Sequence, residues 1–170
     1  MKRNSNVVTF AGNPVTILGR MVRKGDSAKN FVSTAVNLKP VMFSDFQDKI
    51  RIISAAPSID TEVCAQQTRR FNLEASKLPD VQIISISCDL PFALKRFCAT
   101  EGIENLITVS DHKDVDFGIK YGFLIEELRL LARGAIVVDK QNMVRYVEYV
   151  EEITNEPDYG RVLEEVRNLI

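Results

Sequence analysis

Residues 50–56 form a largely aliphatic run that ends at Pro57. A run with so few polar breaks is typical of a strand buried on both faces, as in the centre of a sheet covered by helices. A short polar stretch follows, and residues 65–77 then have helical spacing. A buried strand that leads into a helix is the unit from which α/β folds are built. The polar link would therefore lie at the carboxyl edge of the sheet, where such folds place their sites.

The same alternation of strand and helix continues along the chain. Strands are expected at 81–87, 106–109, 134–138 and 143–150, and helices at 91–101, 115–121 and 156–170. Asp89 is expected to cap the helix at 91–101, and Gly102 to end it. A hairpin around Gly12-Asn13-Pro14 precedes them. This order predicts an α/β fold in one domain spanning 1–170, in which helices flank a sheet and a β-hairpin lies at the N-terminus. It matches a thioredoxin-like sheet by analogy, and other α/β arrangements remain open at this point.

Charge and hydropathy exclude several classes of protein. The 22 basic and 23 acidic side chains leave a net charge of -1, so no basic surface is expected to bind nucleic acid or an anionic membrane. No apolar run approaches the length of a membrane span. The basic residues near the N-terminus are not followed by the apolar segment of a secretory signal. We therefore expect a cytoplasmic protein.

The chain has three cysteines, Cys64, Cys88 and Cys98. An odd and small number does not suit the disulfide framework of a secreted domain. A metal site is not expected, because no C-x-x-C pair occurs and His112 is the only histidine. No cofactor is expected either. For Cys88, which closes a strand, burial as an inert thiol is the favoured interpretation.

Cys64 occupies a special position, because the pattern places it in the first turn of the helix after the buried strand. If Thr61 caps that helix, Cys64 is its third residue. Unpaired backbone N–H groups and the positive end of the helix dipole favour the thiolate there. The neighbouring carboxylate of Glu62 opposes ionisation, so a cation is needed nearby. An inert, packed cysteine remains the alternative interpretation from the residues alone.

Motifs along almost the whole chain carry a family resemblance. They are the opening Val8-Thr9-Phe10-Ala11-Gly12-Asn13-Pro14-Val15-Thr16, the stretch Pro57-Ser58-Ile59-Asp60-Thr61-Glu62-Val63-Cys64, Thr68-Arg69-Arg70-Phe71-Asn72, Asp89-Leu90-Pro91-Phe92-Ala93, Arg96-Phe97-Cys98, Glu101-Gly102, Arg133 before a strand, and Glu156-Pro157-Asp158-Tyr159. Together they resemble the thiol peroxidase (Tpx) subfamily of the peroxiredoxins, of the atypical 2-Cys type.

The resemblance implies a role for each of five residues. Cys64 would be the peroxidatic cysteine, which attacks a hydroperoxide and becomes a sulfenic acid. Thr61 would hydrogen-bond the thiolate and the peroxide, Arg133 would supply positive charge, and Pro57 would shield the thiolate. Cys98 would be the resolving cysteine, which forms an intrachain disulfide with Cys64.

The resemblance also implies substrates and partners. We expect reduction of hydrogen peroxide and alkyl hydroperoxides, recycling by thioredoxin, and a homodimer. Four apolar residues are expected near the site to accept an alkyl tail, namely Phe43, Ile59, Leu124 and Ile125. Two other interpretations stay open: a redox sensor that uses the same cysteines to regulate a partner, and a non-catalytic α/β scaffold with incidental cysteines.

Overall fold

The computed structural model describes residues 1–170 and contains two sheets. The larger sheet has the strand order β11-β10-β5-β6-β7-β3-β4, and the smaller one has the order β1-β2-β8-β9. The strands are β1 (Arg3–Phe10), β2 (Asn13–Leu18), β3 (Val32–Ala35), β4 (Pro40–Met42), β5 (Ile50–Ala55), β6 (Val81–Ser87), β7 (Ile107–Ser110), β8 (Leu124–Ile125), β9 (Leu130–Leu131), β10 (Gly134–Val138) and β11 (Val144–Tyr149). The helices are the 3-10 turn η1 (Phe43–Phe46) and α1 (Glu62–Ala75), α2 (Pro91–Glu101), α3 (Asp116–Tyr121) and α4 (Tyr159–Leu169).

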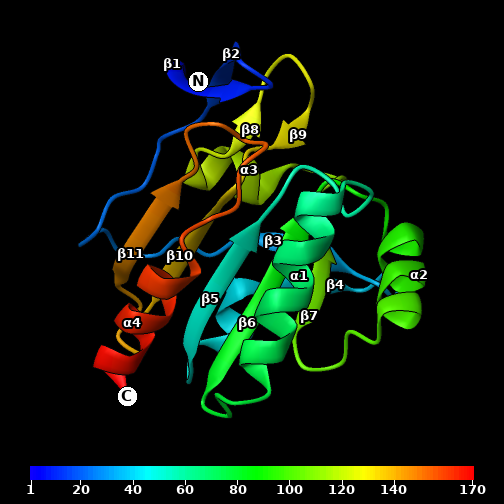
Figure 1. Ribbon diagram of the computed structural model, residues 1–170. Helices are drawn as coiled ribbons and strands as arrows, with labels where there is room; N and C mark the ends of the chain where they lie inside the picture. The colour runs from blue at the N-terminus through cyan, green and yellow to red at the C-terminus, as the bar shows by residue number, and fades with distance from the viewer.

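The large sheet lies between two apolar layers. Its strands β5, β6 and β7 run parallel, and β10 pairs antiparallel with β5. Helices α1 and α4 cover the face that is turned to the viewer in Figure 1. Phe71 of α1 and Val162 and Val166 of α4 pack there against apolar side chains of β5, β6 and β10. A larger cluster forms on the opposite face, where aromatic residues of α3 and of the segment before β3 gather. The predicted α/β sheet flanked by helices is confirmed.

The N-terminal hairpin of β1 and β2 is also present, at the top of Figure 1. The short strands β8 and β9 extend its sheet, because Ile17 and Leu18 of β2 pair with Ile125 and Leu124. The sequence indicated no structure for this second hairpin, since its strands have only two residues each. The two hairpins together form a small sheet above the carboxyl end of β5 (Figure 1).

The ends of α1 and α2 follow mostly from local sequence. Thr61 caps α1 as predicted, with its Oγ1 accepting a hydrogen bond from the backbone N–H of Cys64. Gly102 ends α2 in the left-handed conformation, with a φ of 66°. The prediction that Asp89 caps α2 is wrong: Leu90 is the N-cap residue and makes no side-chain cap. The Asp89 carboxylate instead binds the link between β5 and α1.

Antiparallel pairing of β5 with β10 brings distant residues together. Gly134 lies opposite Ala55, the last residue of β5. Arg133, one residue before Gly134, therefore lies beside the polar link that leads to Cys64. Gly134 is required at this point, because a Cβ atom there would approach the backbone oxygen of Glu148 to 2.1 Å. The close approach of β11 thus fixes the strand that carries Arg133.

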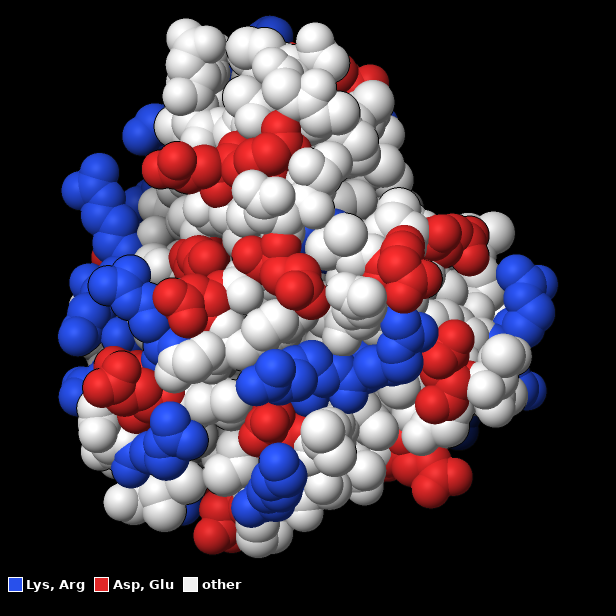
Figure 2. All heavy atoms as spheres, viewed as in Figure 1, with Lys and Arg blue, Asp and Glu red and all other residues white.

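The surface visible in Figure 2 carries basic and acidic side chains interspersed with neutral ones. None of the helices has the length and apolar character needed to cross a membrane.

Candidate active site

The thiol of Cys64 is fully buried at the third position of α1. Its backbone N–H donates to Thr61 Oγ1 at 3.3 Å, and its carbonyl accepts from Thr68 Oγ1 at 3.0 Å. The Thr61 hydroxyl lies 3.3 Å from the carbonyl oxygen of Ser58, to which it donates. In this state Thr61 therefore holds the start of the helix and the link before it.

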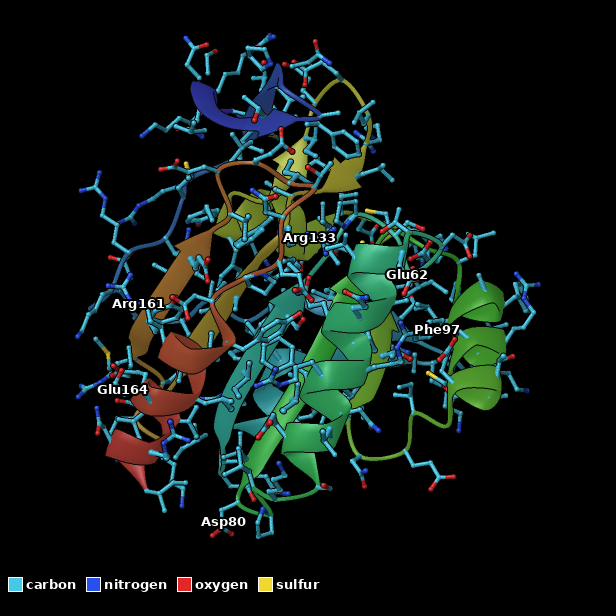
Figure 3. The ribbon with its side chains drawn as sticks, viewed as in Figure 1. Glu62, Asp80, Phe97, Arg133, Arg161 and Glu164 are labelled. Atoms are coloured by element: carbon cyan, nitrogen blue, oxygen red, sulfur yellow. The ribbon has the colours of Figure 1, made fainter.

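Arg133 supplies the cation that the sequence required. Arg133 is 2% exposed, and its Nη2 donates to Cys64 Sγ at 3.1 Å. Figure 3 shows Arg133 at the end of the sheet where α1 begins. A buried guanidinium that donates to a sulfur stabilises the thiolate over the thiol, because the interaction is strongest with a full negative charge.

Two further acceptors hold Arg133 in place. Its Nε donates to the carbonyl oxygen of Ile153 at 2.7 Å, and its Nη1 donates to Gln67 Oε1 at 2.7 Å. Gln67 is buried one turn after Cys64 on α1, and its amide donates in turn to Ser54 Oγ and to the carbonyl of Ala55. The guanidinium is thus oriented by β5, by α1 and by the segment after β11.

A small cavity of about 150 Å³ lies in front of Arg133. Its lining is mostly apolar and comes from Phe10, Pro57, Thr61, Val63, Arg133, Ile153 and Thr154. The N-terminal hairpin and the segment after β11 thus provide one wall, and the link before α1 provides the other. The cavity has room for a small hydroperoxide beside the only cation of its wall.

None of the four apolar residues expected near the site lines this cavity, namely Phe43, Ile59, Leu124 and Ile125. Phe43 stacks on Phe31 on the far face of the sheet, at a centroid distance of 5.1 Å. Leu124 and Ile125 are buried within the small sheet, and Ile59 lies against α2 instead. The apolar lining comes from Phe10, Val63 and Ile153. The sequence did not indicate this lining, because Phe10 and Ile153 reach the site only through the pairing of the hairpin with the C-terminal part of the chain.

The opposing charge of Glu62 is compensated by a neighbour. Its carboxylate lies 2.9 Å from Arg69 Nη2, while Arg69 Nη1 lies 3.1 Å from Glu101 in the last turn of α2. Arg69 therefore joins the start of α1 to the end of α2 and draws the Glu62 charge outward, away from the buried thiol.

Asp89 ties the start of α2 to the link before α1. Its carboxylate accepts from Ser58 Oγ at 2.7 Å and from the backbone N–H of Ile59 at 2.8 Å. Ser87 Oγ, at the end of β6, donates to the same carboxylate at 2.7 Å. The backbone that precedes Cys64 is thereby fixed to the strand that precedes α2.

Cys98 lies apart from this group of residues. Its Sγ is 3.3 Å from Thr108 Oγ1 on β7, and its side chain lines an apolar cavity of about 330 Å³ between α2 and strands β3 and β7. All three cysteines are free thiols. The structure thus brings together Cys64, Thr61, Arg133 and Pro57 and leaves Cys98 with different neighbours.

Cys88 has the environment of an unreactive thiol. Burial raises its pKa to about 12, and the nearby carboxylates of Asp111 and Asp89 act in the same direction. It stays protonated at neutral pH and is a poor nucleophile. No group of three or more His, Cys, Asp or Glu side chains is arranged to hold a metal ion.

Sequence reasoning missed Gln67 and the residues that hold Arg133 from the C-terminal side. Gln67 had a readable signal, since it lies three residues after Cys64 and thus on the same side of α1. The acceptor role of the Ile153 carbonyl had no signal, because a backbone oxygen is available at every residue.

Comparisons with known proteins show which proteins this chain resembles. The redoxin family model matches residues 23–163. A thiol peroxidase of Oceanobacillus iheyensis is 54% identical over 156 residues, covering 92% of this chain and 95% of that protein. A thiol peroxidase of Bacillus subtilis is 48% identical over 163 residues, covering 96% of this chain and 98% of that protein. The crystal structure of a peroxiredoxin-like protein from Aquifex aeolicus superposes with a TM-score of 0.92 at 36% identity and covers both chains completely.

Proposed function

The chain belongs to the redoxin family, in the thiol peroxidase (Tpx) subfamily of the peroxiredoxins, and on this premise we propose that Cys64 is its peroxidatic cysteine and Cys98 its resolving cysteine. The protein is a thiol-dependent peroxidase, and its substrate class is the peroxides. The observation that carries the assignment is the donation of Arg133 Nη2 to the buried Cys64 sulfur at 3.1 Å.

In the first step the Cys64 thiolate attacks one oxygen of the peroxide. A sulfur–oxygen bond forms, the oxygen–oxygen bond breaks, and the leaving oxygen takes up a proton to depart as water or an alcohol. Sulfur is oxidised to the sulfenic acid and the peroxide is reduced. The Arg133 guanidinium stabilises the thiolate first and then the charge that develops on the leaving oxygen.

The small cavity supports binding of the peroxide beside this pair. Thr61 and Arg133 both line it, so the Thr61 hydroxyl can turn from the Ser58 carbonyl to the bound peroxide. Pro57 closes the cavity on the side of the link and keeps water from the thiolate. The apolar wall of Phe10, Val63 and Ile153 suits the carbon atoms of an alkyl hydroperoxide as well as hydrogen peroxide.

In the second step the Cys98 thiol attacks the sulfenic sulfur, an intrachain disulfide forms, and water leaves. A disulfide needs Cα atoms within about 7 Å, and Cys98 has its contacts on β7 instead. We propose that α2 unwinds locally. The helix buries only Pro91 and Leu94, and the 330 Å³ cavity lies beside Cys98. So few packing contacts make local opening cheap.

The charge at the end of α2 also favours local unwinding of this helix. Glu101 occupies the last turn, where a negative charge opposes the helix dipole, and no basic residue lies in that turn to offset it. Arg69 of α1 compensates this charge from outside the helix. Unwinding of the end of α2 would therefore also break the Arg69–Glu101 pair.

We propose thioredoxin as the dithiol that reduces the disulfide and returns both cysteines to thiols. A reducing compartment such as the cytoplasm suits that cycle. A homodimer stays a prediction, which the molar mass of the protein in solution decides.

Peroxide turnover by variants in which one cysteine is replaced by serine tests the proposal. With thioredoxin, its reductase and hydrogen peroxide, Cys64→Ser is expected to abolish peroxide consumption, and Cys98→Ser is expected to stop after one equivalent with Cys64 held as a sulfenic acid. Cys88→Ser serves as the matched control and is expected to turn over like the wild type. Sustained turnover by Cys64→Ser would reject the assignment of Cys64.

A further inference from the structure

Arg133 donates three hydrogen bonds, and the acceptor that is least constrained by secondary structure is the carbonyl of Ile153. Gln67 and Cys64 both belong to α1, whereas Ile153 follows β11 in a segment outside any helix or strand. The carbonyl oxygen of Ile153 nevertheless accepts from Arg133 Nε at 2.7 Å. The orientation of the guanidinium therefore depends on whatever fixes this segment.

The segment after β11 is fastened to the N-terminal hairpin. Thr9 donates its backbone N–H to the carbonyl of Glu151 at 2.7 Å, and Ile153 donates its N–H to the carbonyl of Thr9 at 2.9 Å. These two bonds form an isolated parallel bridge between Thr9 and Glu152. A single bridge without neighbouring pairs is a weak constraint, so further contacts are needed to hold the carbonyl of Ile153 still.

The carboxylate of Glu152 provides those contacts. It accepts five hydrogen bonds, from Thr9 Oγ1 at 2.9 Å, from the backbone N–H groups of Ala11 at 3.2 Å and Gly12 at 2.6 Å, and from the N–H and hydroxyl of Thr154 at 2.9 and 2.7 Å. Three bonds reach the hairpin and two reach its own segment. One side chain thus holds the residues on both sides of Phe10 and of Ile153, which line the active-site cavity.

The hairpin turn depends on the same carboxylate. Ala11 and Gly12 have φ values of 50° and 81°. Positive φ at both positions suits a tight hairpin turn, but alanine is unfavourable there because of its Cβ. The carboxylate accepts from both N–H groups of this turn, which favours the strained conformation over its alternatives.

We propose that Glu152 is a positioning residue of the peroxidase site, which sets the orientation of Arg133 toward Cys64 through the carbonyl of Ile153 and holds the hairpin wall of the peroxide cavity. The proposal rests on the function assigned to Cys64 and Arg133 above. Glu152 touches neither the peroxide nor the thiol.

The chemistry of the cluster requires a carboxylate. All five groups around Glu152 are donors, and an ionised carboxylate is acceptor-only. An amide would turn an NH₂ group toward some of these donors. The surrounding donors, first those of Thr154 and then the N–H of Gly12, lower the pKa of Glu152 to about 2. The carboxylate is therefore ionised throughout the pH range in which the enzyme would work.

The test compares Glu152→Gln with Glu151→Gln. Glu151 is the neighbouring exposed carboxylate and offers only its backbone oxygen to the hairpin, so its side chain serves as the control. The first readout is the rate of Cys64 oxidation by hydrogen peroxide in stopped flow. The second is the pH at which alkylation of Cys64 reaches half its maximal rate. A role in fold stability alone would leave this pH unchanged.

For Glu152→Gln we expect oxidation about tenfold slower, less than the roughly 10²-fold cost of misplacing a group by about 1 Å. We also expect an upward shift of the alkylation midpoint and a larger loss with cumene hydroperoxide than with hydrogen peroxide, because Phe10 and Ile153 line the cavity. Glu151→Gln is expected to match the wild type. If Glu152→Gln matches it too in rate and midpoint, the proposal is overturned.

A milder variant keeps the test open if Glu152→Gln fails to fold. Thr9→Val removes one of the five donors, and the backbone bridge of Thr9 remains. Thr9→Val is expected to change the rate of Cys64 oxidation and the alkylation midpoint in the same direction as Glu152→Gln, but by a smaller amount. Wild-type values for both would overturn the proposal. If the wild type and Glu151→Gln do not oxidise Cys64 either, the function itself is rejected rather than the role of Glu152.

Discussion

Arg133 Nη2 lies 3.1 Å from Cys64 Sγ, although 69 residues separate the two in the sequence. The pairing of Gly134 with Ala55 produces this contact, because it sets the residue before β10 beside the link that follows β5. The charge that favours the thiolate is therefore a product of sheet register. The helix start alone would supply only the smaller contribution of the dipole and the unpaired N–H groups.

Replacing Arg133 by lysine tests the importance of guanidinium geometry. Lysine keeps the charge but cannot bond to Ile153, Gln67 and Cys64 at once with a planar fork. We expect peroxide to oxidise Cys64 roughly 10²-fold more slowly, the cost of losing one aligned donor. Stopped-flow oxidation measures it, with Arg23→Lys as the exposed control. An unchanged rate in Arg133→Lys would mean that charge alone suffices.

Gln67→Met tests the buried acceptor of Arg133. Methionine has a similar volume but leaves Arg133 Nη1 and Ser54 without their partner. We expect the free energy of unfolding to fall by about 1–3 kcal/mol, the penalty for an unsatisfied buried polar group. Oxidation of Cys64 should slow in parallel. Chemical denaturation and stopped flow measure the two effects, and wild-type values for both would contradict the assigned role.

Arg69→Gln tests whether the Arg69–Glu101 pair restrains α2. An exposed ion pair contributes up to about 1 kcal/mol, so its loss should speed disulfide formation from the sulfenic acid by up to about fivefold. Arg70→Gln is the matched control, because the Arg70 ion-pair partner Glu74 lies on the same helix. Rapid quenching followed by mass analysis gives the rate. A slower or unchanged rate in Arg69→Gln would show that opening of α2 does not limit this step.

The raised pKa of Cys88 predicts how the stability of the fold changes at alkaline pH. Its pKa in the folded state is about 12 against an ordinary value of 9.0, because burial disfavours the thiolate. Below pH 9 both states hold the proton; above it the unfolded chain loses the proton first, so stability falls as pH rises. Cys88→Ala should flatten this fall between about pH 9 and 10, below the titration of the tyrosines. Urea unfolding at several pH values checks it, and an equal slope in both proteins would refute it.

Much of the fold followed from the sequence because burial leaves a periodic signal. The apolar run at 50–56, the cap at Thr61 and the stop at Gly102 all mark real boundaries. The strands β8 and β9 escaped prediction because two-residue strands leave no period to detect. The acidic side chain of Asp89 before Pro91 suits a helix cap, but its partners Ser58 and Ile59 lie 31 and 30 residues away in the chain, where no local pattern points to them.

The site was predictable only where chemistry is local. The position of Cys64 at a helix start could be read from its neighbours. Arg133 came from family resemblance, because no local pattern distinguishes it from other arginines. The Ile153 carbonyl and the Glu152 cluster depend on long-range pairing of the hairpin with the C-terminal segment, and no local pattern in the sequence encodes that pairing.

We propose that Cys64 and Cys98 of one chain form the catalytic disulfide, although they have different neighbours in the reduced fold. Mass spectrometry of proteolytic fragments after one equivalent of hydrogen peroxide tests it directly, on equal mixtures of isotopically light and heavy protein. We expect Cys64–Cys98 linked fragments of purely light or purely heavy mass, with Cys88 unmodified. Mixed-mass pairs would show a link between chains, and a Cys64–Cys88 link or an unlinked Cys98 would contradict the intrachain Cys64–Cys98 disulfide.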